Sequence, residues 1–233
     1  KAANKLNLNI YTDYFCLMDE CEKFIQDVDY RKRITQPIYE FFQFQQKALV
    51  SATPLEMRHK ELVNQNFRIL KIVPEYDYRK NLEVIVTNSY DKTVKSKLDD
   101  LQDSPCVCIF INSTNGINKI INTLKLTDYK VFCSNQSVKK LKEREFDNVY
   151  EMLEPLAKYN FFTCRFFSAL DIKLKQKPDI LILTDLNEAV YTMIDPFTEV
   201  IQIQGRFRNG FNSLTHISNV KIDLDIKSKE AID

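Results

Sequence analysis

Short apolar runs alternate with amphipathic segments along most of this chain, and no other feature of the sequence constrains its fold as strongly. Strands are predicted at residues 82–87, 107–111, 130–133, 161–165, 180–183, 199–203 and 215–222. Helices are predicted at residues 92–101, 116–124, 138–144, 149–158 and 187–194. Strands that alternate with helices at this spacing form right-handed βαβ units. We therefore expect an α/β fold built on a mainly parallel sheet.

The first 50 residues are predicted to contain two strands with a long helical segment between them. The apolar run 15–18 is expected to be a buried parallel strand, and 48–50 is expected to be a second one. Residues 22–44 have a helical pattern, interrupted near Pro37 because proline removes a backbone donor.

The next region contains the predicted boundary between two domains. Pro54 suits the first turn of a helix at 55–64, and residues 67–73 alternate apolar and polar side chains like a strand. The stretch 74–80 is mostly polar. We therefore predict two domains, residues 1–75 and 76–233.

The composition is ordinary for a soluble globular protein, with 44% hydrophobic and 28% charged residues. The formal net charge of +1 gives no global attraction for nucleic acid, so any basic surface must be local. Apolar runs stay well below the length of a membrane span, and the chain does not open with a charged and then apolar leader. We expect a cytoplasmic protein with no membrane partner.

The cysteines and glycines exclude several kinds of site. Most of the six cysteines lie in apolar runs, and Cys106 and Cys108 should point to one face of a strand. Because His59 and His216 are isolated, buried reduced thiols are favoured over a zinc site. With three glycines, the chain contains neither the Gly-x-x-x-x-Gly-Lys-Ser/Thr phosphate loop nor a Gly-x-Gly-x-x-Gly dinucleotide motif.

Polar residues follow the two strands predicted before residue 55. Asp19 and Glu20 come directly after the first strand, where one carboxylate could bind Mg²⁺ and the other could orient an attacking water. Ser51 and Thr53 follow the second strand in the string Ser-Ala-Thr-Pro. The alternatives are a solvated acidic turn and a strand-to-helix turn that Thr53 caps.

Hydroxyl side chains also follow predicted strands of the second domain. Ser113 and Thr114 stand at a helix start, where free backbone amides suit a phosphate group. Ser134 repeats the arrangement after the next strand, and a plain helix cap is the alternative at both places.

Two later strings carry further polar residues. Thr163 is followed after seven residues by Asp171 and Ile172. The second string is Gln202-Ile-Gln-Gly205-Arg206-Phe-Arg208. Guanidinium groups stabilise charge on a transferring γ-phosphoryl group, and a glycine before them lets the backbone approach a ligand. The alternative is a loop with two solvated arginines.

Taken in this order, the four strings resemble motifs II, III, V and VI of superfamily 2 helicases, and residues 107–116 resemble motif IV. The resemblance extends from about residue 15 to residue 211. It implies that residues 1–75 are the rear part of one RecA-like domain and residues 76–233 a complete second one. It also implies that the rest of the first domain belongs to a longer protein, a hydrolase that uses ATP and Mg²⁺ to move along DNA or RNA.

The resemblance also implies roles for single residues. Asp19 would hold Mg²⁺, Glu20 would activate water, and Ser51 with Thr53 would couple the ATP site to the nucleic-acid site. On the second domain, Gln202, Arg206 and Arg208 would be catalytic, and Asp171 and Gly205 would bind ATP. The residues implied to contact nucleic acid are Ser113, Thr114, Ser134 and Thr163, with local help from lysines such as Lys119.

The chain departs from the family pattern at Glu22, Ala169 and Asn209, and its shortened Gly-Arg-x-Arg ending resembles the origin-binding-protein-like branch. Because the phosphate loop is missing, we expect this chain alone not to hydrolyse ATP appreciably. The departures also fit a non-catalytic helicase-like module that binds nucleic acid or a partner. An unrelated doubly wound nucleotide- or sugar-phosphate-binding enzyme is the other alternative.

Overall fold

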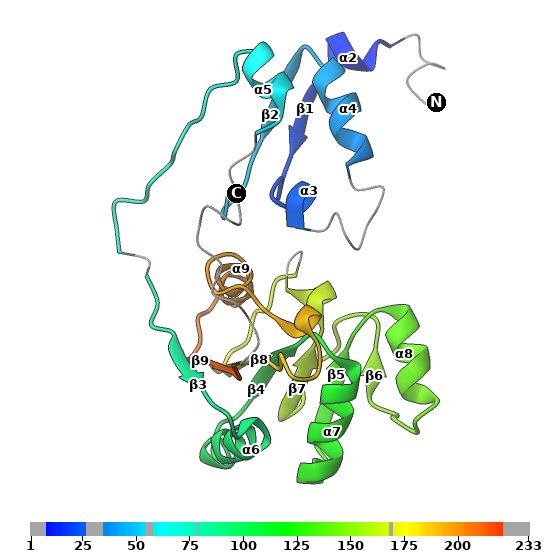
Figure 1. Cartoon of the computed structure of the whole chain (residues 1–233), viewed down its shortest axis with the longest axis vertical. Helices are drawn as coiled ribbons and strands as arrows, with labels where there is room; N and C mark the ends of the chain where they lie inside the picture. Colours follow the sequence, from blue (N-terminus) through cyan, green and yellow to red (C-terminus); the bar gives the residue numbers. More distant parts are fainter. Residues whose placement is uncertain (1–7, 27–34, 55–57, 78, 168–169, 221–233) are drawn as a thin grey trace. The chain divides into compact units, whose positions relative to one another are not determined.

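A computed structural model describes residues 8–26, 35–54, 58–77, 79–167 and 170–220 (Figure 1). The chain divides into two compact units, Lys1–Tyr78 (unit 1) and Arg79–Asp233 (unit 2). The division falls within the polar stretch 74–80. Among the described residues, no helix is both long enough and apolar enough to cross a membrane.

Unit 1 contains a parallel pair of strands. β1 (Phe15–Met18) pairs with β2 (Gln46–Leu49), and Phe15 lies opposite Gln46. The described helices of this unit are α2 (Ile10–Asp13), α3 (Lys23–Gln26), α4 (Gln36–Gln43) and α5 (Lys60–Asn64). A small aromatic core forms where the buried Phe41 ring meets Phe42 and Phe67.

The structure agrees with the interruption predicted near Pro37 but differs from the position predicted for Pro54. Pro37 lies in the first turn of α4, so it begins a helix there. Pro54 does not lie in the first turn of α5, because that helix begins at Lys60 with His59 as its cap. Residues 55–57, predicted as the start of this helix, lie outside the described residues.

Two predictions of burial and pairing in unit 1 are wrong. β1 was expected to be buried, but Phe15 is 57% exposed and Leu17 is 58% exposed. Both side chains point to the same face of β1, and the described helices of unit 1 leave that face open. The predicted strand 67–73 is an unpaired extended segment in which Ile69 is 97% exposed, because alternation alone supplies no partner strand.

Unit 2 confirms the predicted α/β class with a parallel sheet. Its seven strands lie in the order β3-β9-β8-β4-β7-β5-β6, and every neighbouring pair is parallel. The strands are β3 (Glu83–Val86), β4 (Val107–Ile111), β5 (Tyr129–Phe132), β6 (Val149–Tyr150), β7 (Tyr159–Phe162), β8 (Asp179–Thr184) and β9 (Ser213–Ser218).

Helices cover both faces of this sheet. Its described helices are α6 (Tyr90–Asp100), α7 (Thr114–Leu124), α8 (Asn135–Lys142) and α9 (Glu199–Arg206), with short 3-10 turns η1 (Cys164–Phe166) and η2 (Val190–Thr192). Buried residues of α6, α7 and α8 form one core with the sheet, and those of α9 and η1 form the other. Figure 1 shows α9 on one side of the strands and α6 and α7 on the other.

Several elements of unit 2 differ from their predictions. Residues 149–158 were predicted as a helix but contain the short strand β6 followed by a loop. Residues 199–203 were predicted as a strand but belong to α9. Val200, Ile203 and Phe207 are all buried at helical spacing, and this packing outweighs the strand-like apolar run.

The aromatic core beneath α9 gives a direct test of this packing. The buried Phe162 ring stacks between Phe110 and Phe132, with ring centroids 5.0 and 4.9 Å away. Phe162→Ala should therefore lower the free energy of unfolding by about 3–5 kcal/mol, because it leaves a cavity. Urea denaturation would measure this loss. Phe197→Ala is the matched control, since Phe197 is 81% exposed, and an equal loss in both variants would contradict the described core.

Candidate functional site

The strings at Asp19 and Ser51 meet at one edge of the unit 1 sheet, as the sequence predicted. Because β1 and β2 are parallel neighbours, their carboxyl ends lie together. The pairing continues beyond the strands, where the Val50 amide donates to the Met18 carbonyl over 2.9 Å. The Cys21 amide likewise donates to the Val50 carbonyl over 3.1 Å.

Glu22 connects these two strings. The Ser51 hydroxyl donates to Glu22 Oε2 and accepts the Thr53 amide over 3.0 Å. Glu22 is 1% exposed and Thr53 is 6% exposed. A carboxylate this buried needs hydrogen bonds, and Ser51 supplies one. Sequence reasoning marked Glu22 as a departure without a role, so this contact was missed.

Asp19 and Glu20 form the turn directly after β1. Asp19 Oδ1 accepts the Glu20 amide over 2.8 Å, and Glu20 has left-handed backbone with φ 52°. Among the described residues, no group of three or more Asp, Glu, His or Cys side chains could hold a metal ion. Mg²⁺ bound with a nucleotide usually takes one or two carboxylates, with water and phosphate as its other ligands. The exposed Asp19 carboxylate fits that donor set.

The four predicted nucleic-acid residues of unit 2 lie at the carboxyl ends of β4, β7 and β5, which are adjacent strands. Ser113 caps α7 by accepting the Gly116 amide over 2.9 Å, and Thr114 is the first residue of that helix. Ser134 caps α8 by accepting the Ser137 amide over 3.3 Å. This edge is where ligands bind in open parallel sheets.

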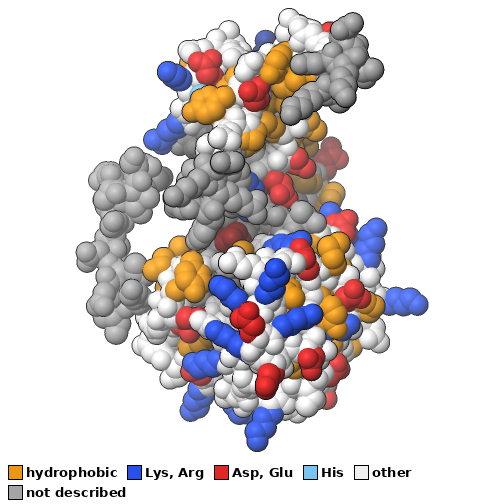
Figure 2. All heavy atoms as spheres, turned by 90° about the vertical axis from the view of Figure 1, so that its right-hand side faces the viewer, with side chains coloured by type: hydrophobic (Ala, Val, Ile, Leu, Met, Phe, Trp, Pro, Cys, Tyr) orange, Lys and Arg blue, Asp and Glu red, His pale blue; other side chains and the backbone are white. Residues whose placement is uncertain are grey.

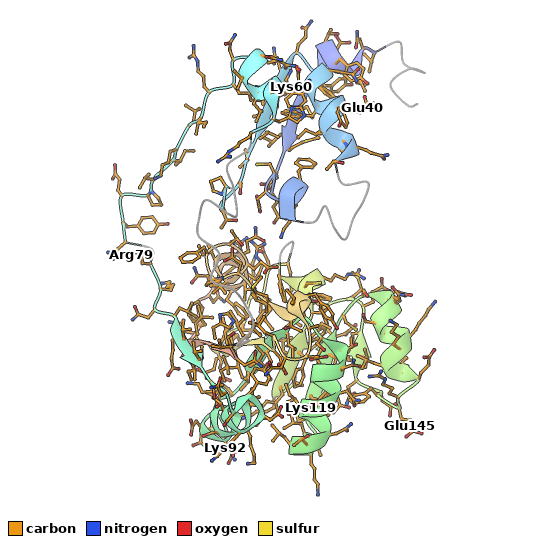
Figure 3. The ribbon with its side chains drawn as sticks, in the orientation of Figure 1. Glu40, Lys60, Arg79, Lys92, Lys119 and Glu145 are labelled. Carbon is orange, nitrogen blue, oxygen red and sulfur yellow. The ribbon has the colours of Figure 1, made fainter. Side chains whose placement is uncertain are left out.

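Thr163 and Lys119 are less available than the sequence suggested. Thr163 is 7% exposed, and its hydroxyl donates to the Phe132 carbonyl over 3.4 Å. Lys119 lies on α7 (Figure 3), and its ammonium is 2.6 Å from Asp91 Oδ2 on α6. On the face of unit 2 seen in Figure 2, Lys and Arg side chains are interspersed with Asp and Glu. That face has no uniformly basic patch among the described residues.

Two carboxylates near this edge were missed by sequence reasoning. Glu188 accepts a hydrogen bond from the Ser113 hydroxyl. Glu151 accepts from Asn135 Nδ2 over 2.8 Å and from Arg165 Nη1 over 3.0 Å. Their positions in loops after β8 and β6 gave no motif that could have identified them.

Polar residues at the ends of β8 and β9 hold the loop that carries Glu188. The Thr184 hydroxyl and His216 Nε2 are 3.0 Å apart, and burial lowers the pKa of His216. Asn219 Nδ2 donates to Asp185 Oδ1 over 2.6 Å, and its amide oxygen accepts the Leu186 amide. These hydrogen bonds fix the start of the loop that carries Glu188.

The strings at Asp171 and Arg206 lie side by side. The Ile172 amide donates to the Arg206 carbonyl over 2.8 Å, and the Arg208 amide donates to the Ile172 carbonyl over 3.1 Å. Arg208 Nη2 is 2.7 Å from Asp171 Oδ1. The substituted position Ala169 lies outside the described residues.

The remaining residues of the closing string sit on α9. Gln202 is buried, and its carbonyl accepts Arg206 Nε over 3.0 Å. A Cβ added at Gly205 would meet nothing within 4 Å. Packing within the described chain therefore does not require this glycine, which leaves approach to a ligand as its predicted role.

Most of the cysteines occupy apolar surroundings, as the sequence predicted, but Cys164 is exposed. All six lie among the described residues and are free thiols, and four of them are buried. Cys106 and Cys108 point to one face of the strand, with their sulfur atoms 3.9 Å apart.

Comparison with known proteins gave no match: no family model fits the chain, and neither a curated protein nor a solved structure resembles it. The chemistry of the chain therefore has to be argued from its own residues.

The ion pair between Asp171 and Arg208 can be tested by titration. The hydrogen bond from Arg208 is the main cause that lowers the pKa of Asp171, and the nearby charge of Arg206 contributes less. Arg208→Ala should raise this pKa towards its ordinary value, and Arg206→Ala should raise it less. NMR titration of the Asp171 carboxyl would measure both shifts.

The same pair sets a direction for stability against pH. Because the folded pKa is lowered, the contribution of the pair is present above the ordinary pKa of Asp171 and is lost as the pH falls through the lowered value. An Asp171 pKa that is unchanged by Arg208→Ala would contradict the described contact.

Proposed function

We propose that this chain is part of an ATP-dependent nucleic-acid helicase or translocase, acting in the cytoplasm on DNA or RNA. The observation that supports it is the pairwise assembly of the four separated strings. Glu22 beside Asp19 bonds to Ser51 in unit 1, and Asp171 bonds to Arg208 in unit 2. Parallel strands bring the ends of neighbouring strands together, and the side-chain bonds between these strings suit a shared task. The free thiols support the cytoplasmic part of the proposal.

In this proposal the residues of unit 1 and those of unit 2 have separate roles in ATP hydrolysis. Asp19 holds Mg²⁺, which neutralises charge on the phosphates when it is bound with ATP. Glu20 positions the attacking water, and Arg206 stabilises the charge that develops on the γ-phosphoryl group. Asp171 holds Arg208 until the nucleotide competes for it. The phosphate loop that completes such a site would come from a further segment or another chain.

The Ser51 hydroxyl is the proposed coupling point in unit 1. It bonds to Glu22 on one side and to the Thr53 amide on the other, so a shift in the acidic turn changes the start of the segment after β2. In unit 2, the hydroxyls at the carboxyl edge are proposed to contact the nucleic-acid backbone.

A non-catalytic binding module is the second candidate. Arg208 is already engaged by Asp171, and the Thr163 hydroxyl is already engaged by the backbone of β5. Both contacts would suit a domain with a helicase-like fold that does not hydrolyse ATP and only binds nucleic acid or a partner. Turnover separates the two candidates.

Nucleic-acid binding is the first test. The chain should bind a fluorescein-labelled single strand weakly, and the affinity should fall steeply as salt rises, because phosphate contacts release counterions. Thr114→Ala combined with Thr163→Ala should weaken binding by more than about tenfold, because it removes two hydroxyls and each hydrogen bond to a charged group contributes about 1.5–3 kcal/mol. Fluorescence anisotropy would measure both effects.

Thr127→Ala is the control for this test, because Thr127 is an exposed threonine beyond the other end of α7. Binding that is indifferent to salt, or equal losses in the control and the double variant, would remove the proposed nucleic-acid contacts.

Arg206 is the test of catalysis, in a protein that also carries a phosphate loop. If its guanidinium acts mainly in the transition state, Arg206→Ala should lower turnover on the order of 10³-fold while ATP binding changes little. Arg206→Lys should not restore turnover, because an ammonium lacks the planar fork. Steady-state ATPase assays and nucleotide titration would separate turnover from binding. Intact turnover in Arg206→Ala would favour the non-catalytic candidate.

A further inference from the structure

Two acidic side chains of unit 2 reach the helix starts that are proposed to meet nucleic acid. Neither belongs to the helix that it contacts. Glu188 comes from the loop after β8 and reaches α7, and Glu151 follows β6 and reaches α8. Both are therefore tertiary contacts and not local caps.

Glu188 lies against the first turn of α7. Its Oε1 atom accepts the Ser113 hydroxyl, which itself accepts the Gly116 amide over 2.9 Å. A Cβ added at Gly116 would stand 3.2 Å from Glu188 Oε2, so the carboxylate is close to the helix backbone. The start of a helix attracts anions, and here a carboxylate takes that place.

The loop is built to hold Glu188 there. Asp185 Oδ1 accepts the Asn187 and Glu188 amides over 3.1 and 3.2 Å, which fixes the turn. Asn112, directly after β4, donates to the Tyr191 carbonyl over 2.9 Å and ties the far side of the loop to the same strand end. Glu188 itself is exposed, so its side chain can leave without opening the core.

Glu151 engages Arg165, which lies in the turn after β7. Arg165 Nη1 is 3.0 Å from Glu151 Oε1, and both side chains are 40% exposed. Asn135, the first residue of α8, donates to the other carboxylate oxygen over 2.8 Å. Hydrogen bonds from Asn135 and Arg165 lower the pKa of Glu151, so it carries its negative charge at neutral pH.

We propose that Glu188 and Glu151 are autoinhibitory contacts that compete with nucleic-acid phosphates for the Ser113 hydroxyl and the Arg165 guanidinium. This inference rests on the proposed function of the carboxyl edge. In the free protein each carboxylate occupies a donor that a backbone phosphate would use. Binding then requires both side chains to swing outward, which keeps affinity low until a phosphate backbone replaces them.

The test replaces each carboxylate by its neutral amide. Glu188→Gln and Glu151→Gln keep the shape and an acceptor oxygen while they remove the charge that competes with phosphate. Each should tighten binding of a labelled single strand about fivefold to tenfold, and the double variant should exceed either one, because a hydrogen bond to a charged group is replaced by a weaker one. Fluorescence anisotropy at fixed salt would measure the affinities.

Glu145→Gln is the matched control, because it makes the same change in net charge at an exposed glutamate after the far end of α8 (Figure 3). At about 0.1 M salt its affinity should stay within about twofold of the unchanged chain, because the length of α8, about 12 Å, separates Glu145 from the helix start and exceeds the Debye length of about 10 Å. Urea denaturation of all variants checks that the fold is retained.

The outcomes separate the two proposals. If the unchanged chain binds with the expected salt dependence but Glu188→Gln and Glu151→Gln bind no tighter than the control, the autoinhibitory role is overturned and the proposed function stands. If only the double variant binds measurably, both the proposed function and the autoinhibitory role are supported. If neither the unchanged chain nor the double variant binds at low salt, the nucleic-acid function fails and the inference fails with it.

Discussion

The burial of β4 on both faces is the constraint on which the rest of unit 2 depends. Val107, Ile109 and Ile111 face the core formed with α6, α7 and α8, while Cys108 and Phe110 face the core formed with α9. A strand with two apolar faces has to lie inside a sheet that helices cover on both sides. Its neighbours β7 and β8 are parallel to it, so polar residues after all three strands meet at one edge.

Backbone hydrogen bonds hold Arg206 and Arg208 more firmly than the ion pair between Asp171 and Arg208 does. Arg208 and Asp171 are about half exposed, and exposed pairs of this kind contribute little to stability. The Ile172 backbone, in contrast, bonds to Arg206 on one side and to Arg208 on the other. The ion pair can therefore exchange partners while the backbone at both arginines stays in place.

The failed predictions of secondary structure and burial share one cause: each depended on contacts with distant parts of the chain. Residues 199–203 have the apolar content of a strand, and only packing of Val200 and Ile203 against the sheet selects a helix. The segment 67–73 alternates like a strand, but strand formation needs a partner that local sequence does not supply. The apolar pattern of β1 likewise says nothing about how many strands its sheet contains.

The sequence by itself determined the α/β class and the placement of the strings at Asp19, Ser51 and Thr163 after strands, because periodicity and strand polarity are local properties. It misplaced the string at Gln202, which lies on α9. Only the tertiary structure decided which side chains meet. Glu22 with Ser51, Arg208 with Asp171 and Ser113 with Glu188 are separated by 29, 37 and 75 residues along the chain. Contacts over such separations depend on strand order and register, which become fixed only when the whole sheet packs between its helices.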